Sequence, residues 1–269
     1  MKKLILLTAA LIVLVPAVAR PDTMTFRLGY YTPNATTNSY IAGHPDSLLG
    51  IEFSQMNFAA SDFRGTMLGG GYEWFLTPQL SLAFSVDFLG RENGGFYRDY
   101  VGLSLNNTDF QGDYAFPAEF YSPDFEILHT LHISMTPIQL SLKIAPLGRK
   151  TRFVPYIGGG GGLYFLHASI IGDLVDFSNG VLVNDPGVPE LGDFLIYPVT
   201  FVNAHETQAV LGGHVFAGLM VPIGYRLTLE AEGRYHFAKA SFNGAFPAAE
   251  FGKFDLSGYS ISIGLNYWF

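Results

Sequence analysis

Apolar residues alternate with polar or small residues along most of the chain after residue 20. The last segment shows this most clearly, because one of its faces carries Tyr259, Ile261, Ile263, Leu265, Tyr267 and Phe269. A spacing of two is typical of β-strands, in which successive side chains point to opposite sides. The same alternation predicts further strands over residues 25–31, 64–76, 80–88, 206–221 and 227–237.

Two more segments alternate less regularly. In residues 125–144 the apolar set shifts by one position after Pro137, which predicts a β-bulge at the proline. Residues 153–167 contain the run from Gly158 to Gly162, flanked by apolar and aromatic residues. We predict a strand there, with glycines where a neighbouring strand packs closely.

The lengths of the connections between these eight segments alternate. Long connections (32–63, 90–124, 169–205 and 238–254) are separated by short ones (77–79, 145–152 and 222–225). This alternation predicts an all-β fold, an eight-stranded antiparallel up-and-down transmembrane β-barrel with long extracellular loops and short periplasmic turns. A ten-stranded barrel remains an alternative, if residues 51–58 pair within the first long connection.

The polar face of the predicted strands carries charges of both signs. A sheet in lipid must close, so this face would line the interior of the barrel. In an eight-stranded barrel side chains nearly fill that interior. We therefore expect a structural network of paired charges, with a proton or ion path along the histidines as the alternative. The predicted interior residues are Arg27, Glu73, Asp87, Lys143, Glu230, Glu232, Arg234 and His236, together with His132 and His214.

The N-terminal segment has the features of an export signal. Lys2 and Lys3 precede an apolar stretch, and Ala17 and Ala19 fit a small-x-small cleavage site. This predicts a signal peptide over residues 1–19 and one exported domain over residues 20–269. An excess of acidic over basic residues, 23 against 15, argues against a nucleic-acid partner. The absence of cysteine excludes disulfides, thiol catalysis and Cys-ligated zinc.

The last strand ends on the aromatic residues Tyr267, Trp268 and Phe269. This ending resembles the C-terminal insertion signal of Gram-negative outer-membrane barrels. Together with the signal peptide and eight strands, it makes the chain similar to small barrels of the OmpA transmembrane-domain and OmpW type. The resemblance implies insertion by the barrel assembly machinery into the cell outer membrane, contact with outer-membrane lipid and lipopolysaccharide, and a monomer.

No motif points to chemistry. A GxSxG elbow is absent, and the glycine run lacks the Lys-Ser/Thr of a phosphate loop. His129 and His132 face opposite sides of a strand, so they cannot share a metal ion. We expect no cofactor, no metal and no catalytic residues, and a structural or ligand-binding role. Tyr97, Tyr100, Phe116 and Tyr121 are candidate contacts for a small hydrophobic ligand.

Two alternatives to this role stay open. The resemblance to OmpW implies passage of small hydrophobic molecules through the barrel mouth and sideways into lipid. An outer-membrane enzyme, a lipid A deacylase or a protease, would need a nucleophile beside a base. Its only candidates are His129 near Ser122 or Thr130, and His205 near Thr207.

Overall fold

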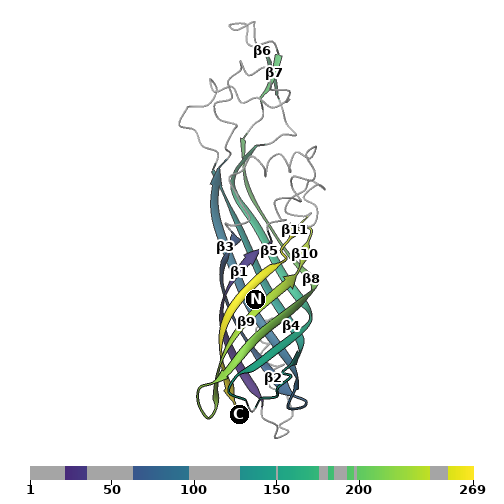
Figure 1. The fold of residues 1–269 in the computed structure, drawn as a ribbon. Helices are drawn as coiled ribbons and strands as arrows, with labels where there is room; N and C mark the ends of the chain where they lie inside the picture. Colours follow the sequence, from purple (N-terminus) through teal and green to yellow (C-terminus); the bar gives the residue numbers. More distant parts are fainter. Residues whose placement is uncertain are drawn as a thin grey trace.

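The computed structural model describes residues 22–34, 63–96, 128–149, 151–175, 181–184, 193–196, 199–242 and 254–269. Within them, eight strands form one closed antiparallel barrel (Figure 1). Each strand pairs with the next along the chain, and the first pairs with the last, from Thr23 beside Trp268 to Pro33 beside Gly258. The strands are β1 (Thr23–Pro33), β2 (Gly65–Phe75), β3 (Leu80–Phe96), β4 (Leu128–Ile144), β5 (Val154–Val175), β8 (Val199–Pro222), β9 (Leu227–Phe237) and β12 (Gly258–Trp268).

The predicted eight-stranded barrel is therefore confirmed. The segment 51–58, on which the ten-stranded alternative rests, lies outside the described residues. No helix in the described part of the chain is long and apolar enough to cross a membrane.

The two faces of the barrel wall differ in polarity. The outward face is apolar, and its side chains are largely exposed, for example Ile261 at 65% and Leu211 at 87%. The inward face of the same strands is polar and buried, as at Arg27, Glu232 and Ser262. A water-soluble barrel would need the reverse arrangement. An apolar exterior on a closed sheet fits a hydrocarbon solvent, because no backbone group is left unpaired at an edge.

The ends of the barrel differ in their connections. At one end lie the tight connections 76–79, 145–153 and 223–226, the start of β1 and the end of β12 (Figure 1). Thr77 closes the first of them, since its Oγ1 accepts a hydrogen bond of 2.9 Å from the backbone N–H of Leu80. The long connections leave the opposite end, which in barrels of this kind faces the outside. They include two short strand pairs, β6 (Val181–Asn184) with β7 (Asp193–Ile196) and β10 (Lys239–Ala240) with β11 (Phe254–Asp255).

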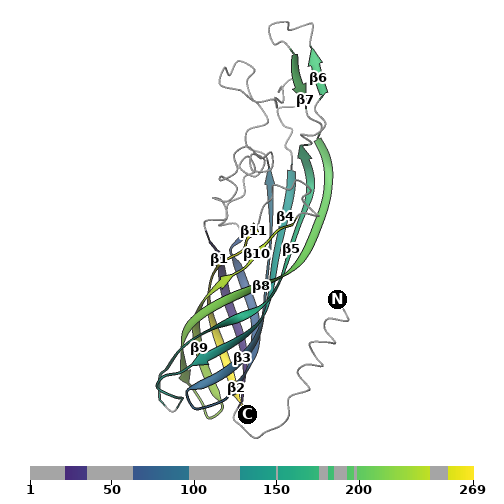
Figure 2. The same cartoon turned by 90° about the vertical axis from the view of Figure 1, so that its right-hand side faces the viewer.

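Four neighbouring strands extend beyond the closed barrel. Residues 90–96 of β3, 128–136 of β4, 166–175 of β5 and 199–211 of β8 form a tall wall on one side (Figure 2). The prediction that residues 90–96, 169–175 and 199–205 belong to loops is therefore wrong. The alternation weakens there because the outward face has left the lipid and carries polar side chains such as Ser134, Ser169 and Thr207.

The bulge predicted at Pro137 is absent. The pairing of β4 with β5 runs without an inserted residue from His129 beside Gly172 to Ile144 beside Ile157. The apolar set changes sides because the surroundings of the strand change. Below the proline Leu140 and Leu142 are exposed outward to lipid, and above it Leu131, Ile133 and Met135 are buried inward, among other residues.

The glycine run of β5 lies where the neighbouring strands approach most closely, as expected. A Cβ atom at Gly160 would collide with the backbone carbonyl oxygen of Leu140, and one at Gly162 with that of Ile138. A Cβ at Gly161 would meet only the Gly212 carbonyl oxygen, at 3.4 Å. Alternate glycines in the run are therefore required by packing, and those between them are not.

We expect Gly160→Ala to destabilise the barrel by about 1–3 kcal/mol, the usual range for overpacking. Gly161→Ala, one position along, should change the free energy of unfolding by less than about 0.5 kcal/mol. Both are measured by urea unfolding of the protein refolded into lipid vesicles. Equal effects at the two positions would contradict the close contact between β4 and β5.

Candidate functional site

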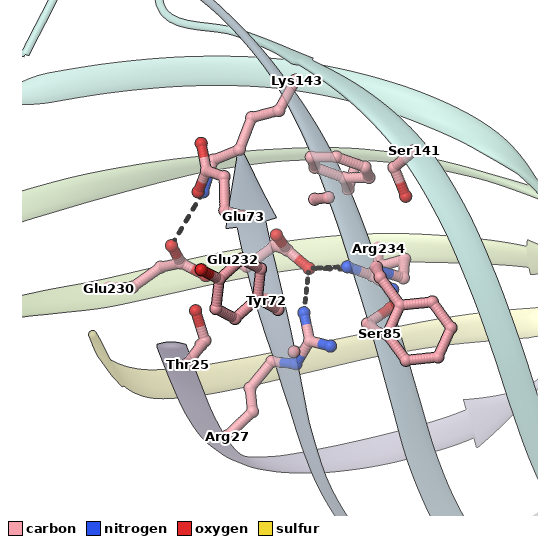
Figure 3. A pocket seen from close by; sticks show the side chains of 14 residues that line it. Thr25, Arg27, Tyr72, Glu73, Ser85, Ser141, Lys143, Glu230, Glu232 and Arg234 are labelled. Carbon is pink, nitrogen blue, oxygen red and sulfur yellow. Dashed lines mark hydrogen bonds and ion pairs between the residues drawn. The ribbon is translucent and has the colours of Figure 1, made fainter. Parts of the chain in front are cut away.

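Inward-facing side chains of the lower barrel form one buried group of charges. The group combines seven residues predicted from the alternation with Arg149, which reaches in from the connection between β4 and β5 (Figure 3). We call it the charged plug, and its members are Arg27, Glu73, Asp87, Lys143, Arg149, Glu230, Glu232 and Arg234.

One half of the charged plug is centred on Glu232. Arg27 from β1 and Arg234 from β9 both point toward its carboxylate (Figure 3), at 3.3 Å from Arg27 Nη1 and 2.8 Å from Arg234 Nη2 to Oε1. Arg27 Nη2 also lies 3.1 Å from Asp87 Oδ1 on β3. The hydroxyl of Tyr156 donates a hydrogen bond of 3.0 Å to the second oxygen of Glu232. These contacts join strands from opposite sides of the barrel.

The other half is centred on Lys143 from β4. Its Nζ lies 3.2 Å from Glu73 Oε2 and 3.0 Å from Glu230 Oε2. Arg149 holds the other oxygen of Glu73 at 2.6 Å, and the side-chain amide of Asn266 donates a hydrogen bond of 3.1 Å to Glu230. Lys143 Nζ also sits 3.8 Å from the centre of the Tyr156 ring, which connects this half to the first.

The charged plug is electrically balanced. It holds four cationic side chains (Arg27, Lys143, Arg149 and Arg234) and four carboxylates (Glu73, Asp87, Glu230 and Glu232), and every one is less than one-tenth exposed. A buried charge is costly unless it is paired and hydrogen-bonded. Because each charge here has at least one opposite partner, the interior can be both polar and dry.

A layer of uncharged hydrogen bonds lies beside the plug. The amide of Gln139 donates to the Tyr164 hydroxyl at 2.6 Å and contacts His236 Nδ1 at 3.4 Å, while its oxygen accepts from Arg234. Ser141 and His214 meet at 2.6 Å. Ser141, Gly160 and His214 are neighbours on β4, β5 and β8, so the missing side chain at Gly160 leaves the space in which this bond forms.

Little free space remains in this part of the interior. The cavity lined by Thr25, Lys143, Phe216 and other plug residues encloses about 30 Å³. That volume holds a water molecule or two and no organic substrate. On one side an apolar cluster of Ala145, Val154, Tyr156, Phe216 and Met220 completes the filling. The lower barrel is therefore blocked by its own side chains.

The chain has the architecture of a small outer-membrane β-barrel. No protein-family model matches it, and no curated protein has a significantly similar sequence. Among solved structures it is similar to a major outer membrane protein from Thermus thermophilus (TM-score 0.44, 11% identity, 92% of this chain and 99% of that chain). It is also similar to OprG from Pseudomonas aeruginosa (0.43, 12%, 92% and 95%) and to Neisserial surface protein A (0.42, 10%, 93% and 97%).

These similarities are too distant to indicate a shared role. What places this outer-membrane barrel in a lipid bilayer is its own structure, because the wall is closed, apolar outside and polar inside.

The histidines predicted for the interior do not all lie there. His214 and His236 are buried inside, but His132 is on the outward face of β4, so its prediction is wrong. The reason is the uninterrupted register of β4: the predicted bulge would have shifted the side chains on one side of Pro137, and without it the odd-numbered residues face inward throughout.

The remaining predicted residues lie at the ends of the barrel or beyond them. Trp268 stacks on Phe75 at 5.1 Å between ring centres, and Tyr267 and Phe269 contact each other at 5.3 Å on the outside. Aromatic girdles of this kind mark the membrane–water boundary. The candidate ligand contacts Tyr97, Tyr100, Phe116 and Tyr121 lie outside the described residues.

Sequence reasoning missed Arg149, Tyr156, Tyr164 and Gln139. Arg149 belongs to a turn, where no alternation indicates direction. Tyr156 and Tyr164 have the same parity as the inward-facing glycines of β5, a signal that the weak strand propensity of the run obscured. Among the described residues, no three His, Asp or Glu side chains are already arranged around a common metal position.

Proposed function

We propose that this protein is a closed outer-membrane barrel with a structural or ligand-binding role, in which the membrane-spanning part carries no substrate and performs no reaction. The observation that carries the proposal is the balanced, buried charged plug. A conducting pore needs a continuous wet path, and here cations and carboxylates from opposite walls bond across the interior. The barrel then serves as an anchor for its extracellular side.

The candidate catalytic residues do not support an enzyme. His129 points inward and its neighbour Thr130 outward, so they cannot form a dyad, and Ser122 lies outside the described residues. Thr207 bonds to His167 Nδ1 at 2.8 Å. A nucleophile and base of this type also need a group that orients the base, and no such carboxylate bond to His167 occurs in the described part of the chain.

A second function has one observation in its favour. Above the plug, the inward face of the tall wall is apolar and includes Leu131, Ile133, Leu166 and Ile170. Such a surface suits a small hydrophobic ligand held on the outer side, as in the hydrophobic passage that the OmpW resemblance implies. Since the plug blocks the route downward, any exit would have to be sideways into lipid.

The test of the closed barrel is conductance. Purified protein refolded into a planar lipid bilayer should give no current steps, because the remaining cavity is not a channel. A general porin, measured in the same membrane, serves as the positive control. Stable, ohmic steps from the wild-type protein would overturn the proposal.

The non-enzymatic role is tested separately, on lipid. Lipid A from cells that make the protein should have the same acylation as lipid A from cells without it, measured by mass spectrometry. The matched comparison is the Thr207→Val variant, which removes the only hydroxyl found beside an imidazole on the outer surface of the described wall. A deacylated species that disappears in this variant would establish an enzyme instead.

A further inference from the structure

Imidazoles gather on the outward face of the tall wall. His132 on β4 and His167 on β5 lie diagonally across the strand pair, and their ring centres are 5.6 Å apart. His205 on β8 lies on the other side of His167, since it pairs with Ser169. All three face away from the plug and play no part in it.

This histidine group lies just beyond the apolar band of the barrel. The outward residues of β4 change from Leu140 and Ile138 to Thr136 and Ser134 before His132 is reached, and those of β5 change after Phe165. His132 and His167 are half-buried, and His205 is exposed. The group is therefore open to water at the outer surface of the membrane.

We propose that His132 and His167 together bind a divalent transition-metal ion of the Zn²⁺ or Cu²⁺ class. Two imidazoles that share a tetrahedral zinc ion have ring centres roughly 5 Å apart, because each Zn–N bond is about 2.0–2.1 Å. The observed 5.6 Å is close to this separation. Since three ligands are not already converged on one point among the described residues, water completes the coordination of this two-histidine site.

The contact between His167 and Thr207 prepares one ligand. Thr207 Oγ1 lies 2.8 Å from His167 Nδ1. When Nδ1 donates its proton to this hydroxyl, the lone pair is on Nε2, which is left to bind the metal. Histidine ligands in metal sites are usually oriented by such a bond from their second nitrogen.

The surrounding charges favour a cation over an anion such as a lipid phosphate. Glu92 on β3 is the direct cross-strand neighbour of His132 and is exposed on the same face. Partial burial, and then the neighbouring His132 and His205, lower the pKa of His167. A neutral imidazole beside a carboxylate is a metal ligand and a poor site for phosphate.

The experiment is a titration of Zn²⁺ into the untagged, refolded protein in detergent micelles, followed by calorimetry. We expect saturable binding to the wild-type protein, and at least about tenfold weaker binding to His132→Ala and to His167→Ala. Thr207→Val should also weaken binding, by about 10–100-fold, the usual cost of losing the group that orients a ligand. Ser134→Ala, a neighbour on the same face, is the matched control and should bind as the wild-type protein does.

A second readout identifies the ligands directly. The electron paramagnetic resonance spectrum of bound Cu²⁺ should show two coordinated imidazole nitrogens in the wild-type protein and one in His167→Ala. The five other histidines of the chain remain in the double variant His132→Ala/His167→Ala. Equal affinity in this double variant and the wild-type protein, or no saturable binding to the wild-type protein, would overturn the proposal. A folded barrel is verified in each variant by its slower migration in unheated gels.

Discussion

Lys143→Met is expected to destabilise the folded barrel by about 3–5 kcal/mol. The substitution keeps the length of the side chain and removes the charge that lies 3.0 Å from Glu230 and 3.2 Å from Glu73. Glu73 retains Arg149, but Glu230 keeps only the amide of Asn266. The cost comes from the uncompensated carboxylate left in a dry interior, and it is measured as the free energy of unfolding in urea from lipid vesicles.

The chain offers a matched control for this effect. Lys239 forms an ion pair with Asp255 at the same distance, 3.0 Å, but its side chain is 60% exposed. Lys239→Met should therefore cost less than about 1 kcal/mol, as exposed pairs do. In the double variant Lys143→Met/Glu230→Gln much of the loss should be recovered, because the unpaired charge is gone. A loss of the same size at Lys239 and Lys143 would show that the interior is hydrated, contrary to the closed plug.

Where the wall meets lipid, the strands could be predicted from the sequence. β9 was expected over residues 227–237 and runs from Leu227 to Phe237. The reason is physical: hydrocarbon outside and polar packing inside impose opposite demands on alternate residues, so the pattern is visible. Above the membrane neither demand holds. Glu92, Ser134 and Thr207 face water there, and the same strands continue without the pattern that would reveal them.

The composition of the interior could be predicted, but its pairing could not. Alternation shows that Arg27, Asp87 and Glu232 face inward, yet it contains no information about which of them meet across the barrel. That depends on how far each strand is offset from its neighbour around the closed wall. Arg27 and Glu232 are 205 positions apart in the chain and bond at 3.3 Å.

The glycine run explains how a narrow barrel holds so many large polar side chains. Lys143, Ser141 and Gln139 on β4 are paired with Gly158, Gly160 and Gly162 on β5. The absence of side chains on β5 leaves room for those of β4 to reach toward β8 and β9, as in the bonds of Ser141 to His214 and of Lys143 to Glu230. The least strand-like part of the sequence is thus what makes the interior network possible.

Placing an arginine on the outward face is expected to have the next-largest effect. Ile263 lies in the middle of the outward row of β12 and is 61% exposed. Ile263→Arg should destabilise the protein in lipid vesicles by about 2–4 kcal/mol, the cost of a charge near the bilayer midplane on the lipid face of a barrel. The free energy of unfolding in urea, followed by tryptophan fluorescence, measures it.

The depth of the position decides this result, so the control is the same substitution outside the membrane. Tyr225 lies in the tight connection between β8 and β9 and is 98% exposed, more than Ile263. Tyr225→Arg should cost no more than about 1 kcal/mol, as at the interface. If the outward face were in water, an exposed Ile263 would accept arginine as readily as Tyr225 does. A difference of less than about 0.5 kcal/mol between the two variants would therefore remove the lipid from the outside of the barrel, and with it the reason for a polar interior.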